Sequence, residues 1–563
     1  MVLCEGIKLA IFMSKKTEVS CQTNHWFTSV FLVNSKRKGT KEKMKKNKLV
    51  LLSAILAMTL MFGACFSTAS AAEDNIFRYA VAFPNMTTLD VHKSTTTDVI
   101  LPANAIVEPL LDITESGEIV PLLLETLPTT DDGVLFTCKL KQGVKWHDGS
   151  ELTSADIEFT FNRIFDPLTG NVNVWLCDMI KGGQDMLDGK TDALEGFKVI
   201  DEYTFTIELD YAYAPFLSVL ATEMMVMYPK AACEAAGDAW GVSTFVGTGP
   251  FEFVELMGAD YMEAKRFDDY HGEVAKIDGL FIYNMEKGTA LLEFETGGVD
   301  MVRVDPEMIA PYETGEFADN VTRVDLMAII TMNLNVDMAP LDNVKVREAI
   351  TYAVDREALV NGYLQGRAHA TNSLIPPGIL GYPEDRAIST YNPERAKELL
   401  AEAGYPDGIT LENYVSETAE VANVAVVLQE QLKASGITMN VNKVDGPSYT
   451  DMRRAGSVQI PFLTWYKDIA DPDNFTYTFY FSGNSKFFSS GWNDAKTDEL
   501  LTKGRSVAQE ERLAVYQEAE AYMLQEQFMA VPLYNPVHYY LIADGVEGVK
   551  FDDSMISFGN ISK

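Results

Sequence analysis

The chain has 563 residues, of which 46 are Lys or Arg and 81 are Asp or Glu, giving a formal net charge of −35. At about 100–200 residues per domain, this length suffices for several domains. A composition of 47% apolar and 23% charged residues is typical of globular proteins and disfavours disorder or fibres. The acidic excess disfavours nucleic acid as a partner, because phosphate binding needs surplus Lys and Arg. It also disfavours docking of the protein surface on anionic lipid.

The start of the chain differs in charge from the rest. Residues 1–64 hold eleven Lys or Arg and three Glu, a net charge of +8, which leaves −43 for residues 65–563. A lysine-rich stretch precedes an uncharged, mainly apolar run from Leu49 to Phe62, and small residues follow it. This order predicts a secretory signal peptide over residues 44–64, since a spanning helix needs about 20 apolar residues. We interpret residues 1–43 as unstructured or as the product of a start codon assigned too far upstream.

Two cleavage sites compete after the apolar run. Gly63-Ala64-Cys65 resembles a lipobox, in which the cysteine sulfur takes a diacylglycerol and becomes the mature N-terminus. Alternatively, Ala69-Ser70-Ala71 is an A-x-A site for the ordinary signal peptidase. We favour lipid attachment at Cys65, with residues 65–72 as a tether. The protein would then contact the membrane only through its lipid anchor.

The body of the chain lacks the usual motifs of metal, cofactor and nucleophile chemistry. Cys138, Cys177 and Cys233 are its only cysteines, without C-x-x-C spacing, so neither a zinc site nor a disulfide framework is expected. No G-x-S-x-G or H-E-x-x-H motif occurs. Residues 247–251 lack the third Gly of a dinucleotide loop and favour a tight turn. We therefore predict no catalytic residues, no metal and no cofactor.

Local patterns along the body predict both strands and helices. Apolar and polar residues alternate over residues 134–140 and again over 205–209, as in half-buried strands. Apolar residues at i, i+4, i+7 and i+8 mark residues 346–354 as one face of a helix. Asp342 is a candidate cap for that helix, and Asp355 for the next one.

Two further helices follow in the second half. Asn392-Pro393-Glu394 has the residues that open a helix, and Gly404 the type that ends one. A later helix carries a stripe of apolar residues at helical spacing: Leu513, Tyr516, Ala519 and Met523. Because strands and helices alternate through most of the body, the predicted fold class is α/β.

The body also contains a series of motifs in the order found in one protein family. They are Gly143-Val144-Lys145-Trp146-His147-Asp148-Gly149 with its flanks over 121–156, Gly247-Thr248-Gly249-Pro250-Phe251, Asn333-Leu334-Asn335 with 342–347, Ala353-Val354-Asp355-Arg356-Glu357, Ile375-Pro376-Pro377-Gly378, 391–396, Asp471-Pro472-Asp473-Asn474-Phe475 and Ala530-Val531-Pro532-Leu533-Tyr534. Each motif alone is weak. Together, over residues 73–563, they resemble solute-binding protein family 5 of ABC importers, which includes dipeptide-, oligopeptide- and nickel-binding proteins. We interpret the motifs as scaffold rather than as ligand contacts.

The resemblance implies a three-lobed periplasmic-binding-protein architecture of the Venus-flytrap type. Lobe I is discontinuous and comprises residues 73–112, 223–325 and 528–563. An extra lobe II comprises residues 113–222, and lobe III comprises residues 326–527. The chain would cross between lobes I and III twice, which makes a hinge, and ligand would bind in the cleft between them.

The resemblance also implies a ligand site. Asp468 matches the position of an Asp that pairs with the α-ammonium of bound peptides in relatives, and the alternative is a helix or turn cap. Trp465 and Tyr466 are expected to line a side-chain pocket, with core packing as the alternative. Lys467 would either point away or neutralise Asp468. From lobe I, the hydroxyls of Thr96 and Thr97 are candidate contacts.

One departure from the family pattern bears on the ligand. Dipeptide-binding relatives place an Arg for the ligand carboxylate in lobe III, but residues 412–423 here contain no Arg or Lys. The absence of a cation in this segment favours a longer peptide, or a ligand that is recognised mainly through its amine. The predicted function is therefore capture of peptides outside the membrane by a monomer that delivers them to ABC permease and ATPase subunits. Alternatives are another solute, such as a nickel chelate, opine or oligosaccharide, an exported peptidase, and a chemoreceptor partner or adhesin.

Overall fold

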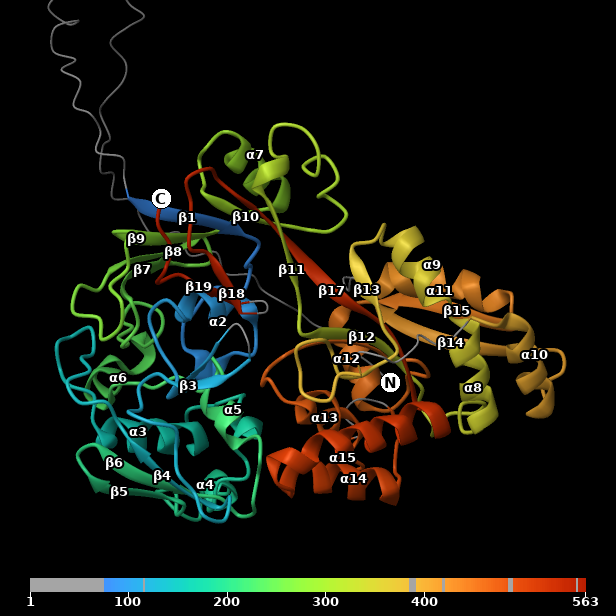
Figure 1. Ribbon diagram of the computed structural model, residues 1–563, viewed down its shortest axis with the longest axis horizontal. Helices are drawn as coiled ribbons and strands as arrows, with labels where there is room; N and C mark the ends of the chain where they lie inside the picture. Colours follow the sequence, from blue (N-terminus) through green and yellow to red (C-terminus); the bar gives the residue numbers. More distant parts are fainter. Residues whose placement is uncertain (1–74, 115–116, 384–390, 418–420, 485–489, 553–554) are drawn as a thin grey trace, which may run out of the picture. The chain divides into compact units, whose positions relative to one another are not determined.

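The computed structural model describes residues 75–114, 117–383, 391–417, 421–484, 490–552 and 555–563 (Figure 1). Residues 75–563 form one compact unit of strands and helices, which confirms the predicted α/β class. The predicted extension, signal peptide, tether and lipidation site at Cys65 lie outside the described residues. Among the described residues, no helix combines the length and the apolar character that crossing a bilayer requires.

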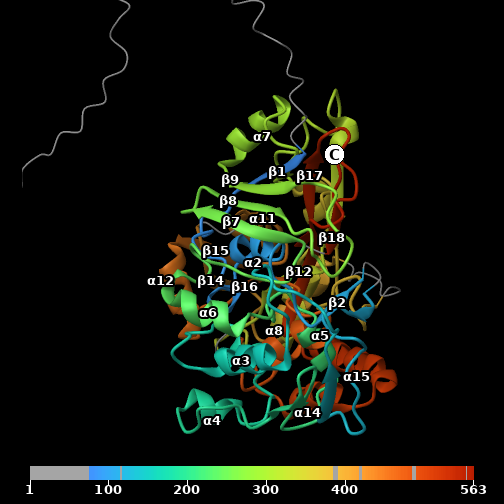
Figure 2. The same cartoon turned by 90° about the vertical axis from the view of Figure 1, so that its left-hand side faces the viewer.

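The largest sheet of the described residues has ten strands. Its order is β16-β12-β17-β10-β1-β9-β8-β7, and β11 and β13 also pair with β17. β1 runs parallel to both of its neighbours, and Figure 2 shows β7, β8 and β9 side by side. The bounds are β1 Ile76–Val81, β7 Phe251–Met257, β8 Tyr261–Arg266, β9 Gly279–Asn284, β10 Met301–Val304, β11 Val321–Asp325, β12 Ala328–Asn333, β13 Ala368–Ala370, β16 Phe462–Tyr466 and β17 Ala530–Ile542.

Strand β17 belongs to both halves of this sheet. Its first part, up to Tyr534, pairs with β12, and its second part, from Val537, pairs with β10 and β11. Between the two parts lies Pro536, whose carbonyl accepts a hydrogen bond from the Leu326 amide at 3.4 Å. Leu326 itself joins β11 to β12. The two chain segments that connect the halves of the sheet therefore lie side by side.

Four smaller sheets complete the strands that the structure describes. Three are antiparallel, and β14 pairs with β15 in parallel. The bounds are β2 Leu111–Ile113, β3 Ile119–Pro121, β4 Leu135–Lys139, β5 Phe197–Asp201, β6 Thr204–Glu208, β14 Ile409–Ser416, β15 Ile437–Val444, β18 Lys550–Asp552 and β19 Met555–Ser557. β4 and β6 fall where alternation predicted them, with Phe136, Cys138, Phe205 and Ile207 buried.

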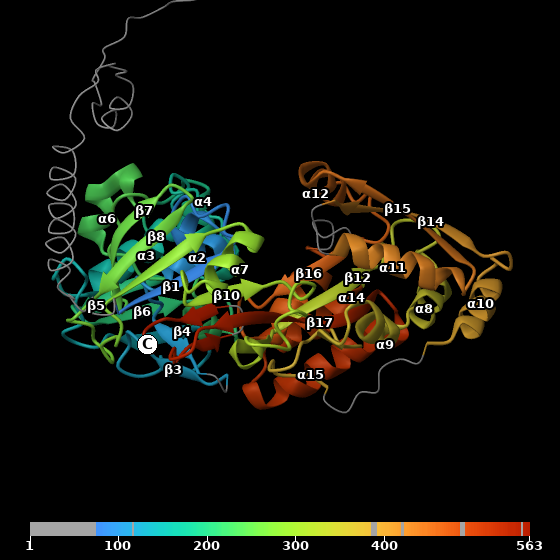
Figure 3. The same cartoon turned by 90° about the horizontal axis from the view of Figure 1, so that it is seen from above.

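The helices pack against the sheets and against one another. Helices α8 and α10 pack together, and α11 covers the β14–β15 pair (Figure 3). The bounds are α2 Thr97–Ala103, α3 Ser154–Phe165, α4 Gly183–Leu187, α5 Phe216–Leu220, α6 Lys230–Ala236, α7 Lys287–Glu295, α8 Val344–Ala353, α9 Arg356–Ala358, α10 Pro393–Glu402, α11 Val421–Lys433, α12 Gly446–Arg454, α13 Tyr477–Tyr480, α14 Ala495–Ser506 and α15 Gln509–Ala521.

Two predicted caps are confirmed and one is wrong. The Asn392 side chain accepts from the Arg395 amide at the start of α10, and Asp355 caps α9 by accepting from the Ala358 amide. Helix α8 begins one residue later than expected. Its cap is therefore Asn343, which accepts from the Lys345 amide at 3.0 Å, and not Asp342.

The apolar stripe of α15 is only partly right. Tyr516, Ala519 and Met523 are buried, whereas Leu513 is 41% exposed. Each step of three residues rotates the helix about 60° short of a full turn, so Leu513 falls at the margin of the stripe. The helix then passes into a π-helical turn over Tyr522–Glu526.

Two family motifs pack against each other, as a scaffold would require. The His147 ring donates from Nε2 to the Gly249 carbonyl at 2.9 Å and accepts at Nδ1 from the Gly247 amide at 3.2 Å. A Cβ on Gly247 would lie 1.8 Å from the Ile106 carbonyl oxygen, so only glycine fits there. Gly149 has a φ of +85°, which ends the turn that begins at Trp146.

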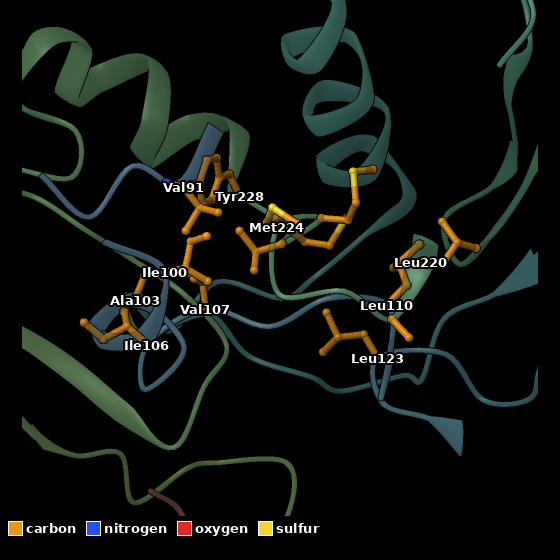
Figure 4. Close-up of a cluster of buried hydrophobic side chains, with 14 of the residues drawn as sticks. Val91, Ile100, Ala103, Ile106, Val107, Leu110, Leu123, Leu220, Met224 and Tyr228 are labelled. Carbon is orange, nitrogen blue, oxygen red and sulfur yellow. The ribbon is translucent and has the colours of Figure 1, made fainter. Parts of the chain in front are cut away.

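Buried apolar residues form separate cores in different parts of the chain. The largest joins residues 77–301 with Ile469, Tyr540 and residues 556–561, and Figure 4 shows one part of it around Val91, Ile100 and Leu110. Two other cores lie almost wholly within residues 329–534. Lobes I and II as drawn from the sequence thus share one core, and the lobe boundaries stay a prediction.

A buried ion pair fixes the loop that follows β16. Arg512 on α15 donates to both carboxylate oxygens of Asp471, at 2.6 and 2.7 Å, and both side chains are buried. Arg512→Met leaves this carboxylate buried without a cation. We expect the free energy of unfolding in urea to fall by about 3–5 kcal/mol, the cost of breaking a buried pair from one side.

An exposed pair provides the matched control. Arg395 contacts Glu398 and Glu402 on the surface of α10. Arg395→Met should leave the free energy of unfolding nearly unchanged, because solvent screens exposed ion pairs. Equal losses for the two variants would contradict a structural role for the Asp471–Arg512 pair.

Candidate functional site

A cavity of about 190 Å³ lies where five segments of the chain meet. Its lining residues are Phe83, Thr97, Asp98, Arg303, Tyr466 and His538. Phe83 follows β1, Thr97 and Asp98 begin α2, and the last three lie on β10, β16 and β17. Of the residues proposed from the sequence, Thr97 and Tyr466 line this cavity together although they lie far apart in the chain. Thr96 does not line it; this residue is exposed and lies 3.1 Å, between hydroxyl oxygens, from Ser94.

The two aromatic residues of β16 point to different surroundings. The Trp465 ring packs edge-on against Phe479 with centroids 4.8 Å apart, and it joins an apolar core. The neighbouring Tyr466 ring lies 6.1 Å from the His538 ring at the cavity. Adjacent residues of a strand face opposite sides, so one of the pair is core and the other lines the cavity.

Asp468 lies two residues beyond Tyr466 and is held by Asn474. The Asn474 amide nitrogen donates to a carboxylate oxygen of Asp468 at 3.1 Å, and its amide oxygen accepts from the Asp468 backbone N–H at 3.0 Å. The Asn474 oxygen also accepts from the Trp465 indole at 3.2 Å. These bonds fix the direction of the Asp468 side chain. Asp468 does not cap the helical turn at Pro472–Phe475, which Asp471 caps.

The Asp468 carboxylate has no ion pair among the residues that the structure describes. Burial therefore dominates its electrostatics and raises its pKa to about 7, although Asn474 and Lys467 act in the opposite direction. Lys467 extends to Asp552, with 3.0 Å between nitrogen and oxygen, and is almost fully buried. Of the two roles considered for this lysine, its ion pair is with Asp552 and not with Asp468.

The loop after β16 is anchored by further buried polar contacts. The Tyr213 hydroxyl donates to Asp473 at 3.0 Å, and Arg505 lies 3.3 Å from the same carboxylate. The Thr222 hydroxyl donates to the Asp468 carbonyl at 2.7 Å. Asp471, Asp473 and Asn474 are thus structural supports for Asp468.

Arg303 gives the wall of the cavity a positive charge, and His538 lies in the same wall. Burial acts to lower the pKa of Arg303, but nearby tyrosines, first Tyr79 and then Tyr540, raise this pKa by more, so the guanidinium stays charged. Burial, together with the Arg303 charge, lowers the pKa of His538 to about 3, so its ring is neutral near pH 7. On the opposite side, Asp98 accepts from the backbone and side-chain nitrogens of Asn85 at 2.9 and 3.1 Å.

Sequence reasoning missed Phe83, Asp98, Arg303 and His538. Arg303 did leave a signal, because it is a charged residue in a strand whose other members, Met301, Val302 and Val304, are buried. A charge inside an apolar strand needs a partner or a function. The described residues hold no group of three or more His, Cys, Asp or Glu that could bind a metal ion.

Comparison with known proteins identifies the family. Residues 118–487, more than half of the chain, match the family described as "Bacterial extracellular solute-binding proteins, family 5 Middle", so the chain belongs to this family of solute-binding proteins. Heme-binding protein A of Haemophilus influenzae is 27% identical over 457 residues, covering 77% of this chain and 82% of that protein. The dipeptide-binding protein of Escherichia coli is 27% identical over 428 residues, covering 72% and 79%.

A solved structure shares the fold. The ABC transporter-associated periplasmic binding protein DppA from Helicobacter pylori, in complex with the peptide STSA, gives a TM-score of 0.71 at 23% identity, over 86% of this chain and 98% of that chain. The periplasmic-binding-protein fold implied by the sequence motifs is therefore confirmed, as is the family resemblance.

The hydrogen bond from Asn474 predicts a measurable effect on Asp468. Because this bond favours the ionised carboxylate, Asn474→Ala should raise the pKa of Asp468 further above about 7. The titration is followed by NMR of protein labelled with ¹³C at the aspartate carboxyls, and the resonance is assigned by its loss in Asp468→Asn.

A second asparagine serves as control for this titration. Asn442 on β15 donates to Glu412 at 3.2 Å and forms no hydrogen bond with Asp468. Asn442→Ala should leave the Asp468 titration unchanged. A lowered or unchanged pKa in Asn474→Ala would show that Asn474 does not stabilise the charged form.

Proposed function

We propose that this protein captures peptides outside the cytoplasmic membrane and delivers them to the permease and ATPase subunits of an ABC importer. Longer peptides are favoured over strict dipeptides, because residues 412–423 offer no cation for a dipeptide carboxylate. The observation that carries the proposal is the Asp468 carboxylate, which is held by Asn474 two residues beyond the cavity-lining Tyr466 and has no ion pair among the described residues. The ammonium group of a peptide would supply that cation.

The physical case for an amine site rests on burial. An ionised carboxylate away from water is costly unless a cation compensates it, and enclosure strengthens the attraction when one arrives. Asp468 meets both conditions, because burial raises its pKa and Lys467 is already engaged with Asp552. The named relatives bind haem and dipeptides, so the family alone does not choose a ligand. The carboxylate favours a ligand with an amine.

Enclosure of the ligand would come from closure of the lobes about the hinge formed by β17 and by the β11–β12 connection. Contacts between the predicted lobes support a cleft that can close. The Tyr213 hydroxyl bonds Asp473, the Ala214 amide donates to the Arg505 carbonyl at 2.8 Å, and Lys467 pairs with Asp552. Anchoring through a diacylated Cys65 would keep the protein beside its permease despite the acidic body.

Removing the Asp468 charge should weaken peptide binding. Asp468→Asn keeps the shape and can still accept from Asn474, but it cannot neutralise an ammonium group. We expect calorimetry with the peptides that co-purify with the protein, identified by mass spectrometry, to show a loss of about 2–5 kcal/mol in binding free energy. N-acetylated versions of these peptides should bind the unaltered protein as weakly as free peptides bind Asp468→Asn.

Affinity should also depend on pH with a definite sign. Since the pKa of Asp468 is raised to about 7, this carboxylate becomes protonated as the pH falls below that value, and affinity should decrease; Asp468→Asn should remove the dependence. Asp268→Asn, which changes an exposed carboxylate that pairs with Arg266, is the control and should bind like the unaltered protein. Near-unchanged affinity in Asp468→Asn would refute the amine site.

Closure makes a separate prediction for the protein in solution. Saturating peptide should reduce the radius of gyration measured by X-ray scattering and raise the melting temperature, because ligand stabilises the state that binds it. Asp468→Asn at the same peptide concentration should change less. An identical scattering profile with and without tightly bound peptide would argue for a rigid cleft.

A further inference from the structure

Arg303 lies at the centre of the sheet with its side chain at the cavity. Strand β10 pairs with β1 on one side and with β17 on the other, and its remaining residues are buried. Arg303 itself is half-buried and lines the cavity with Tyr466 and His538. A guanidinium so placed has lost much of its water, and it needs hydrogen-bond acceptors in return.

The nearby acids do not supply those acceptors. Asp305, two residues along the chain, forms an ion pair with Lys287, and Asp98 across the cavity accepts two hydrogen bonds from Asn85. No hydrogen bond or ion pair of the Arg303 guanidinium is found in the described part of the chain. Its neighbours are instead the phenol groups of Tyr79, Tyr466 and Tyr540.

His538 adds a second polar group without a partner. It lies on β17 beside Arg303, and its Nδ1 is buried with no hydrogen-bond partner. Because its ring is neutral near pH 7, one ring nitrogen carries a proton and the other accepts one. An anionic group at this wall would satisfy Arg303 and could also accept from the imidazole.

From these contacts we propose that Arg303, assisted by His538, binds a carboxylate of the captured peptide, and thereby replaces the cation that is missing from residues 412–423. This inference rests on the proposed peptide function and adds a second recognition point to the amine site. Guanidinium and carboxylate match as a planar pair that can form two parallel hydrogen bonds.

The positions of the two charges suit a zwitterionic ligand. Tyr466 lines the cavity with Arg303, and Asp468 is two residues farther along the chain, so the Cα atoms of Tyr466 and Asp468 lie at most about 7.6 Å apart. A peptide could therefore place its amine at Asp468 and a carboxylate at Arg303 while passing Tyr466. The carboxylate can come from the chain end or from an acidic side chain.

The test compares three peptide pools. The first contains tri- to pentapeptides of uncharged residues with free carboxyl ends, the second the same peptides with amidated ends, and the third amidated peptides that end in Glu. Retained peptides are identified by mass spectrometry, and the affinity of the best-retained member of each pool is measured by calorimetry.

Amidation should weaken binding to the unaltered protein roughly 10- to 100-fold, the value of hydrogen bonds to a charged group. Restored binding in the third pool would show that a side-chain carboxylate serves, and its absence would assign the chain end.

Variants locate the effect at Arg303. In Arg303→Met the free and amidated pools should bind equally, at the level of the amidated pool with the unaltered protein. Arg266→Met removes a half-buried arginine of β8 that does not line the cavity and should retain the full difference. Should Arg303→Met fail to fold, the comparison of the pools on the unaltered protein still decides.

Two outcomes overturn the inference and differ from each other. If free and amidated peptides bind the unaltered protein equally, and Asp468→Asn weakens both, then peptide capture stands and the carboxylate site at Arg303 falls. If no pool binds the unaltered protein, both the peptide function and this inference fall together.

Discussion

The structure depends on one strand that two halves of a sheet share. β17 pairs with β12 in its first part and with β10 and β11 in its second, so one strand joins chain segments that lie about 200 residues or more before it in the sequence. Pro536 interrupts the run of donors between the parts, because proline has no N–H. The cavity forms next to this strand, with His538 of β17, Arg303 of β10 and Tyr466 of β16 in its wall.

A second constraint acts at the loop that carries Asp468. The carboxylate of Asp468 stands without a cation, and such a group keeps its direction only if its surroundings are rigid. Asn474 provides that rigidity directly, and the buried ion pair between Asp471 and Arg512 holds the same loop in place. The three acids of this loop therefore differ: Asp471 and Asp473 form ion pairs within the protein, and Asp468 forms none among the described residues.

Local patterns in the sequence predicted those strands and helix caps that depend only on residues close together in the chain. The alternation over residues 134–140 and the Asn392 cap follow from strand or helix periodicity, and the error at Asp342 was a shift of one residue. The wall of the cavity could not be predicted in this way. Phe83, Arg303 and His538 come together only through the pairing of β1, β10 and β17, and that order is set by contacts between distant segments. Trp465 was assigned to the site and packs in a core, because strand alternation allows only one of two adjacent residues to face the cavity.

The acidic excess of the body bears on how Asp468 and Arg303 are interpreted. A domain with 43 excess negative charges has many carboxylates that water or lysine can neutralise, so an acid without a cation is not unusual on its surface. Arg303 lines the cavity and has no ion pair among the described residues, although acids outnumber bases nearly two to one in the chain. Arg347 and Arg356 are more deeply buried, but backbone carbonyls accept hydrogen bonds from their guanidinium groups. In the proposed function, the opposite charges of Asp468 and Arg303 act as one site that a ligand completes.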